Sequence, residues 1–171
     1  TKAESASGCA PSFGGYNYQL PAFEQGYRIL FQGDSITDGK RGENANDLNH
    51  YLGDGYVYMI AGRLGVEMAE QQLDVMNRGK SGNTLAALRN RWQADAIDLN
   101  PDILTILIGT NDVERGIRKP ERRVTPVAFE KDYRFILDAS RKANPELRLV
   151  LMEPFILQSG RLSDETVYQT R

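Results

Sequence analysis

Three short segments of the sequence contain residue types that acyl transfer requires. Ser35 follows a short apolar run and precedes a possible helix start, where its hydroxyl could be a nucleophile and its N–H an oxyanion donor. Gly82 would let its backbone N–H approach a ligand closely, and the side-chain amide of Asn111 can also donate to an oxyanion. Taken singly, each residue fits a turn or a helix cap at least as well.

A general base is harder to find. The sequence contains one histidine, His50, so a mechanism with a histidine base must use it, take one from another chain or do without. His50 lies in a polar stretch after Ser35, where a surface histidine is the simpler interpretation. Asp34 and Asp112 are interpreted as turn and network carboxylates. No His, Cys and Asp cluster has metal-ligand spacing and no dinucleotide glycine pattern is present, so we expect neither a metal nor a cofactor.

Short apolar runs alternate with longer amphipathic segments from Arg28 onward. The pattern predicts strands at 28–32, 73–77, 103–108 and 147–152, and helices at 56–64, 84–95 and from Thr125 to about 143. Strands that alternate with helices favour right-handed β-α-β units. We therefore expect a flavodoxin-like three-layer α/β/α fold with a parallel sheet. The loops after the strands, which include 109–124, would meet at one edge, where ligands bind in such sheets.

Composition narrows the classes of protein. The 171 residues carry a net charge of −2 with 26% charged residues, which fits one domain and argues against nucleic-acid binding. The longest apolar runs, such as 103–108, are too short to span a bilayer. We divide the chain into an N-terminal tail (1–26) and a domain (27–171). The lone Cys9 ends a stretch, 6–9, that resembles the end of a bacterial lipoprotein signal, which favours an extracytoplasmic or lipid-anchored protein.

The three segments occur in an order that resembles a known family. Gly-Asp-Ser at 33–35, Gly-Asn at 82–83 and Gly-x-Asn-Asp at 109–112 are similar to the conserved blocks of the SGNH hydrolases, also called GDSL esterases and lipases. The resemblance covers about 28–154 and is greatest to the bacterial acylhydrolase branch with many carbohydrate acetyl esterases. It implies that Ser35 is the nucleophile and that the Ser35 N–H, the Gly82 N–H and the Asn111 side chain form the oxyanion hole.

The sequence departs from this family in one respect. The family has Asp-x-x-His near the C-terminus, which supplies the base and its orienting carboxylate, and no such motif occurs near Arg171. We therefore expect a domain that is truncated at its C-terminus. In a serine protease, loss of the triad histidine costs about 10⁶ in kcat, so activity would be weak unless His50, another subunit or a carboxylate acting through water substitutes. A missing strand would also expose a sheet edge and favour a homo-oligomer.

These observations predict a serine esterase that hydrolyses short acyl esters, above all acetyl esters on carbohydrate. The main alternative is a degenerate domain of the same family that binds a glycan or a partner protein without turnover. A phosphate- or nucleotide-binding module of the same fold is a further alternative.

Overall fold

The computed structural model describes residues 22–42 and 50–155 and shows a parallel sheet between helices. The predicted tail up to residue 21, the lipoprotein-like stretch 6–9 and the last predicted segment from 156 lie outside the described residues. Among the described residues, the elements in chain order are β1 (Arg28–Gly33), α1 (Ser35–Asp38), α2 (Tyr56–Glu67), η1 (Ala69–Gln71), β2 (Asp74–Asn77), α3 (Leu85–Asn90), η2 (Gln93–Ile97), β3 (Ile103–Leu107), α4 (Thr110–Arg118), η3 (Pro120–Arg122), α5 (Pro126–Ala143) and β4 (Arg148–Met152).

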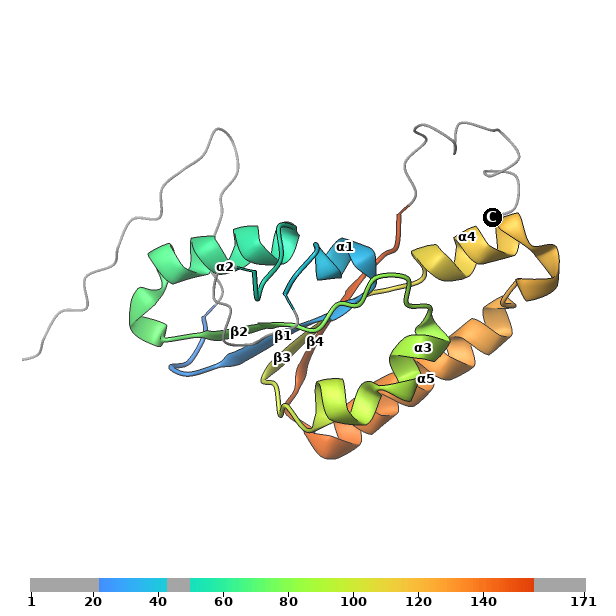
Figure 1. The fold of residues 1–171 in the computed structure, drawn as a ribbon. Coiled ribbons are helices and arrows are strands. Elements are labelled where there is room, and N and C mark those ends of the chain that lie inside the picture. The colour runs from blue at the N-terminus through green and yellow to red at the C-terminus, as the bar shows by residue number, and fades with distance from the viewer. Residues whose placement is uncertain (1–21, 43–49, 156–171) are drawn as a thin grey trace, which may run out of the picture.

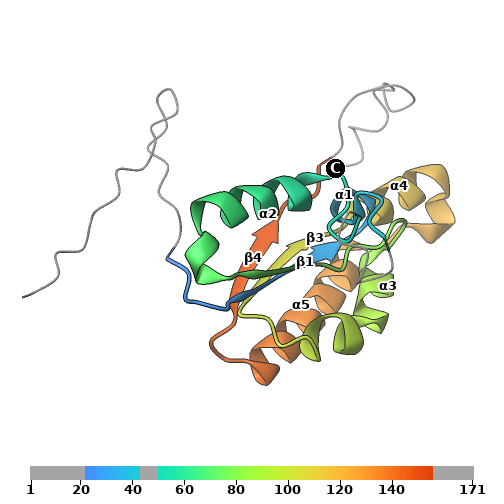
Figure 2. The ribbon, with the colours of Figure 1, turned by 60° about the vertical axis from the view of Figure 1, so that its left-hand side comes forward.

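The strands are ordered β2-β1-β3-β4 and all neighbours are parallel. Helix α2 covers one face of the sheet, and α3 and α5 cover the other (Figures 1 and 2). The expected three-layer α/β/α fold is thus confirmed. Strand β1 lies between β2 and β3, which places the segment after β1 at the centre of the carboxyl edge.

Two apolar clusters hold the layers together, one on each face of the sheet. On the α3 and α5 face, Leu30, Leu104 and Ile106 pack against Leu88 and Ile136, all of which are fully buried. The smaller cluster under α2 is built from Ile29, Phe31, Val57, Leu64, Met68 and Ile103. The side chains of alternate residues in β1 and β3 therefore point to opposite faces of the sheet, as expected for strands that are buried on both faces.

The predicted helix starts are confirmed, but two predicted spans need correction. The Thr84 and Thr125 side chains cap α3 and α5 by accepting from Ala87 N and Ala128 N. The continuous helix predicted at 84–95 is wrong, because α3 ends at Asn90 and a π-helical turn, η2, follows. The loop predicted at 109–124 is also wrong: its first half is helix α4.

Strand β4 is the last strand in the order of the described sheet, and its side chains are only partly buried. Val150 is 44% exposed on the face that α2 covers elsewhere, and Leu151 is 50% exposed on the opposite face. An exposed strand of this kind can pair with another chain, so the expected association through a sheet edge stays a prediction. Within the described residues, no helix is both long and apolar enough to cross a membrane.

Candidate active site

The segment after β1 places Ser35 at the carboxyl edge of the sheet. Ser35 is the first residue of α1 and is exposed, whereas the Asp34 that precedes it is buried. Asp34 is the N-cap: one carboxylate oxygen accepts from Ile36 N at 3.0 Å. Its other oxygen is buried and has no partner among the described residues. Burial raises the pKa of Asp34 above its ordinary value, and the hydrogen bond from Ile36 opposes that rise.

Gly82 lies in the loop after β2, in a tight turn. The N–H of Asn83 donates to Lys80 O at 3.1 Å, which closes a four-residue turn with Gly82 in its third position. The φ of Gly82 is +77°, the value that a type II turn requires there. A Cβ at Gly82 would meet no atom within 4 Å, so its backbone faces open space. The turn therefore needs glycine for its conformation rather than for lack of room.

Asn111 lies in the first turn of α4 and contacts the Gly82 turn. Its Nδ2 donates to Asn83 O at 2.9 Å, and Arg115, one helical turn further along, donates to Gly82 O at 2.8 Å. The neighbouring Asp112 is buried and accepts from the backbone N–H of Leu85 at 3.0 Å, which ties α4 to the start of α3. Burial raises the pKa of Asp112. Asp34 and Asp112 thus act as cap and network carboxylates, as expected.

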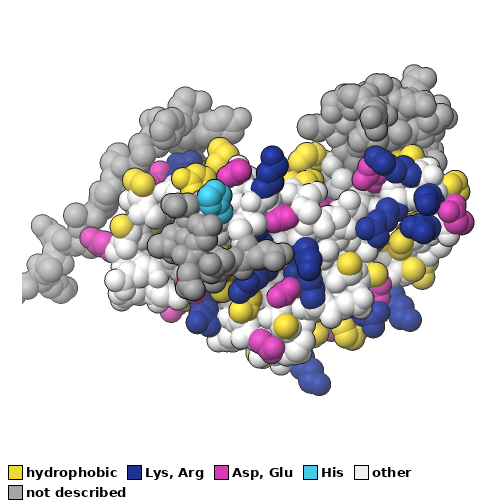
Figure 3. All heavy atoms as spheres, viewed as in Figure 1, with side chains coloured by type: hydrophobic (Ala, Val, Ile, Leu, Met, Phe, Trp, Pro, Cys, Tyr) yellow, Lys and Arg dark blue, Asp and Glu magenta, His cyan; other side chains and the backbone are white. Residues whose placement is uncertain are grey.

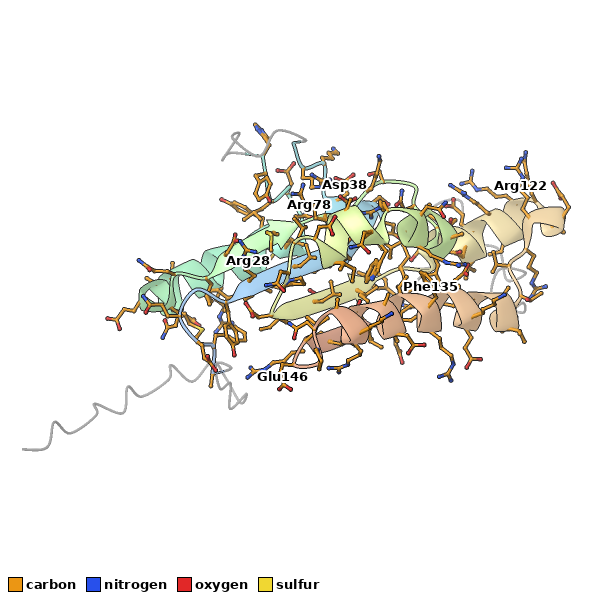
Figure 4. All side chains as sticks on the ribbon, turned by 90° about the horizontal axis from the view of Figure 1, so that it is seen from below. Arg28, Asp38, Arg78, Arg122, Phe135 and Glu146 are labelled. Atoms are coloured by element: carbon orange, nitrogen blue, oxygen red, sulfur yellow. The ribbon has the colours of Figure 1, made fainter. Side chains whose placement is uncertain are left out.

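Hydrogen bonds also join the Gly82 turn to the segment that carries Ser35. Lys80 N donates to Gly33 O at 3.1 Å, and Ser81 N donates to the Asp38 carboxylate at 3.0 Å. Figure 4 shows Asp38 and Arg78 near one another, with Arg122 well away from both. Ser35, Gly82 and Asn111 are therefore brought to one edge by direct contacts between their segments.

His50 lies at the same edge. It is exposed, and its carbonyl accepts from Gly42 N at 2.7 Å and Gly53 N at 3.1 Å. The segment that follows it packs against the end of α1, because Asp54 N donates to Gly39 O at 2.6 Å. The structure thus places the single histidine beside the turn that follows Ser35, with an exposed side chain (Figure 3).

Sequence reasoning missed the residues that organise this edge. Asn77, at the end of β2, is fully buried, and its amide donates to Thr37 O at 2.7 Å and to Leu52 O at 2.9 Å. It also accepts from Gly79 N at 2.9 Å. The available signal was a polar residue directly after the apolar pair 75–76 at the end of a buried strand.

The basic residues of α4 and η3 form a separate feature. Lys and Arg side chains gather over these two elements (Figure 3). Within this group, Arg118 pairs with Glu114 along α4, and Arg115 contacts the Gly82 turn. The segment that was expected to be a loop is thus helical in α4 and η3, and one of its arginines contacts the candidate site.

An apolar cavity of about 360 Å³ lies on another side of α4. Its walls include Gly109, Val113, Ile117, Phe129 and Pro154, and none of Ser35, Gly82 and Asn111 lines it. Helix α4 therefore separates this cavity from the candidate site. The candidate chemistry therefore rests on the exposed Ser35 hydroxyl and the Gly82 turn rather than on this apolar cavity.

Comparisons with known proteins identify the family of this chain. An acetylxylan esterase of Geobacillus stearothermophilus is 34% identical over 137 residues, which cover 79% of this chain and 63% of the relative. Solved structures of an acetylxylan esterase from that bacterium include catalytic mutants with a serine, an aspartate or a histidine replaced by alanine. The serine variant has a TM-score of 0.70 and 32% identity, and the match covers 86% of this chain and 69% of that one.

Two further relatives come from other bacteria. A GDSL-like lipase of Parabacteroides merdae has a TM-score of 0.79 and 36% identity, with 85% of this chain and 67% of that chain covered. An uncharacterized lipoprotein of Bacillus subtilis is 32% identical over 89 residues, 52% of this chain and 36% of the relative. The chain thus spans less than two thirds of the length of the curated relatives it matches. Residues 31–170, which include all three candidate site segments, match the model of the GDSL-like lipase/acylhydrolase family, and the chain belongs to this family.

Proposed function

We propose that Ser35, Gly82 and Asn111 form the active site of a serine esterase. One observation carries the proposal: an exposed serine at a helix N-terminus shares one edge of the sheet with an open glycine turn and an oriented amide. Helix N-termini and turn N–H groups stabilise negative charge, which is what an acyl-transfer transition state develops. The family and the esterase relative support the same chemistry.

In the proposed mechanism the Ser35 hydroxyl oxygen attacks the ester carbonyl carbon as its proton passes to a base. The carbonyl oxygen becomes an oxyanion, which accepts from the backbone N–H groups of Ser35 and Gly82 and from the Asn111 amide. That amide has two N–H donors, and Asn83 O holds one of them, so the second would serve the oxyanion. The base then returns the proton to the leaving alcohol, and water hydrolyses the acyl-enzyme to release the acid.

His50 is the candidate base within this sequence. Asp47 precedes it by three positions, the same spacing as the family's aspartate and histidine, although Asp47 lies outside the described residues. The catalytic aspartate and histidine variants of the acetylxylan esterase relative support a requirement for a base of this type. A histidine from a second chain, or a carboxylate acting through water, would replace His50 if the His50→Ala variant keeps full activity.

The proposed substrates are short acyl esters, above all acetyl groups on carbohydrate, because the esterase relative acts on acetylxylan. The lipoprotein relative supports an extracytoplasmic or lipid-anchored site of action. The alternative is a domain that binds glycan or a partner without turnover. It predicts binding of acetylated oligosaccharide that is unchanged by Ser35→Ala.

The first experiment compares p-nitrophenyl acetate hydrolysis by this chain and by its Ser35→Ala and Asn111→Ala variants. We expect Ser35→Ala to reduce the rate to that of buffer, and Asn111→Ala to reduce kcat by about 10²–10³. Asn90→Ala, an exposed asparagine at the end of α3, is the matched control and should leave the rate unchanged. Equal rates for the wild type and Ser35→Ala would refute the esterase proposal and favour the binding domain.

A further inference from the structure

We propose that Arg91, just after α3, is a positioning residue that fixes the oxyanion turn relative to the strand end that carries Ser35. This inference rests on the proposed esterase function. It concerns a residue outside the motifs of the family resemblance and one that does not itself reach the reacting atoms.

The turn at 80–83 presents Gly82, so the position of its two ends decides where the Gly82 N–H lies. One end is held by β1, since Lys80 N donates to Gly33 O at 3.1 Å. The other end is held by Arg91, whose Nε donates to Asn83 Oδ1 at 2.8 Å. Arg91 is therefore the side chain that anchors the far end of the turn.

The same guanidinium reaches the strand end. Its terminal nitrogens donate to Gly33 O at 3.2 Å and to Gln32 Oε1 at 3.0 Å, and both acceptors belong to the last two residues of β1. A further bond runs to Arg78 O at 2.8 Å, where the loop leaves β2. Gly33 O thus accepts from both Lys80 and Arg91, and it lies two residues before Ser35. A planar group with several fixed donors can make this set of contacts, whereas one ammonium cannot.

The anchor extends to the third oxyanion donor. Asn83 O accepts from Asn111 Nδ2 at 2.9 Å, so the residue that Arg91 holds also orients the Asn111 amide. A displacement of Asn83 would therefore move two of the three donors together. An oxyanion hole acts through donors that are fixed within a few tenths of an ångström. A small shift of these donors therefore lowers kcat more than it weakens substrate binding.

Arg91 is itself fixed on the opposite side. Asp95 pairs with its Nη1 at 2.9 Å, and the Arg91 side chain is only 16% exposed. Arg89, two positions earlier on α3, provides the contrast: it pairs with Asp132 on α5 and stacks over Phe135, and within the part of the chain that the structure describes it makes no hydrogen bond to the site segments. The two arginines are thus close in the sequence, carry the same charge and each form one ion pair. Of the two, Arg91 contacts the segments of the candidate site.

The test measures kcat and KM for p-nitrophenyl acetate with the full chain and the Arg91→Met, Arg91→Lys, Asn83→Ala and Arg89→Met variants. We expect Arg91→Met to lower kcat about tenfold to a hundredfold with KM within about twofold of wild type. We expect the kcat of Arg91→Lys to lie between that of Arg91→Met and that of the wild type. Asn83→Ala removes the same contact from the loop side without changing the Gln32 and Asp95 contacts, and the double variant Arg91→Met/Asn83→Ala should lose less than the product of the single losses.

Arg89→Met controls for a general loss of stability. We expect its kcat within about twofold of wild type at a temperature where thermal unfolding shows every variant folded. A kcat for Arg91→Met or Asn83→Ala that equals that of Arg89→Met would overturn the positioning role while leaving the esterase intact. If the wild type does not exceed Ser35→Ala, the esterase proposal itself fails, and the inference with it, so the two failures are distinguishable.

Discussion

Replacing Asn77 by alanine tests whether polar contacts hold the candidate site together. The Asn77 side chain is fully buried and joins three segments: it donates to Thr37 O in α1 and to Leu52 O before α2, and it accepts from Gly79 N after β2. The alanine variant keeps the backbone and removes these three bonds, together with a longer one from the Asn77 amide to Asp38 O at 3.4 Å. The freed carbonyls and the N–H would then remain in a site with little access to water.

The magnitude follows from those contacts. A net hydrogen bond contributes about 1 kcal/mol, so loss of the three bonds, of 2.7–2.9 Å, lowers the free energy of unfolding by about 3 kcal/mol. The cost rises toward about 5 kcal/mol if the freed groups stay unsatisfied. Asn144→Ala is the matched control, because Asn144 is only partly buried and makes weaker bonds to Pro101 O at 3.3 Å and from Glu146 N at 3.0 Å. We expect about 1 kcal/mol for that variant.

Urea unfolding followed by tryptophan fluorescence measures both values. The chain has one tryptophan, Trp92, which is 2% exposed and donates its indole N–H to Ser140 Oγ at 3.0 Å. Its emission therefore reports the core on the α3 and α5 face, on the opposite side of the sheet from α2. A loss for Asn77→Ala no larger than that for Asn144→Ala would refute the reasoning.

Three further outcomes are expected from variants whose unfolding free energies are measured in the same way. Gly82→Ala should lose about 1 kcal/mol from its φ of +77° alone, because no atom would clash with the new Cβ, and a loss near zero would contradict the assigned turn. Ser140→Ala should lose about 1 kcal/mol and shift the Trp92 emission, and an unchanged spectrum would contradict the indole hydrogen bond. Burial raises the pKa of Asp34 above 3.8, so the protonated carboxyl contributes to the free energy of unfolding at low pH, and this contribution is lost as the pH rises above about 4. Asp34→Asn should therefore gain stability relative to wild type between pH 4 and pH 7, and a parallel pH profile would contradict this.

The sequence pattern predicted the layers well because the strands are buried on both faces and the helices on one. The apolar run at 103–108 and the stripe that includes Tyr133 and Ile136 both reflect burial, which periodicity detects directly. The threonine caps before α3 and α5 were also visible, because a cap needs one residue type at one position.

Helix α4 was not predicted, for a physical reason. Its sequence, from Thr110 to Arg118, contains the poor helix former Gly116, and the one residue that it buries is the carboxylate Asp112, which accepts from Leu85 N. The apolar stripe of this helix is short, because it consists of Val113 and Ile117 on the face that lines the apolar cavity. Two apolar residues among charged ones are also typical of a polar loop, so the pattern alone does not distinguish the two structures.

The three candidate site residues were found from their types and order, whereas the residues that hold them were not. Ser35, Gly82 and Asn111 each follow a strand, and parallel strands bring such positions to one edge. Asn77 and Arg91 act through contacts with segments far away in the chain, such as Leu52 O and Gln32 Oε1. No local pattern carries that information, because a buried amide or guanidinium is recognised only by the acceptors that surround it.

The position of β1 in the sheet has a consequence for how the chain folds. β1 is the first strand of the sheet in chain order, yet its neighbours are β2 and β3, and Leu30 pairs with Leu104, 74 positions further along. Closing loops of this length costs entropy before any pairing compensates for it, which slows folding. During synthesis, the apolar residues 29–31 must wait for β3 to emerge before they gain both neighbours. We therefore expect this segment to be the part of the nascent chain most in need of a chaperone.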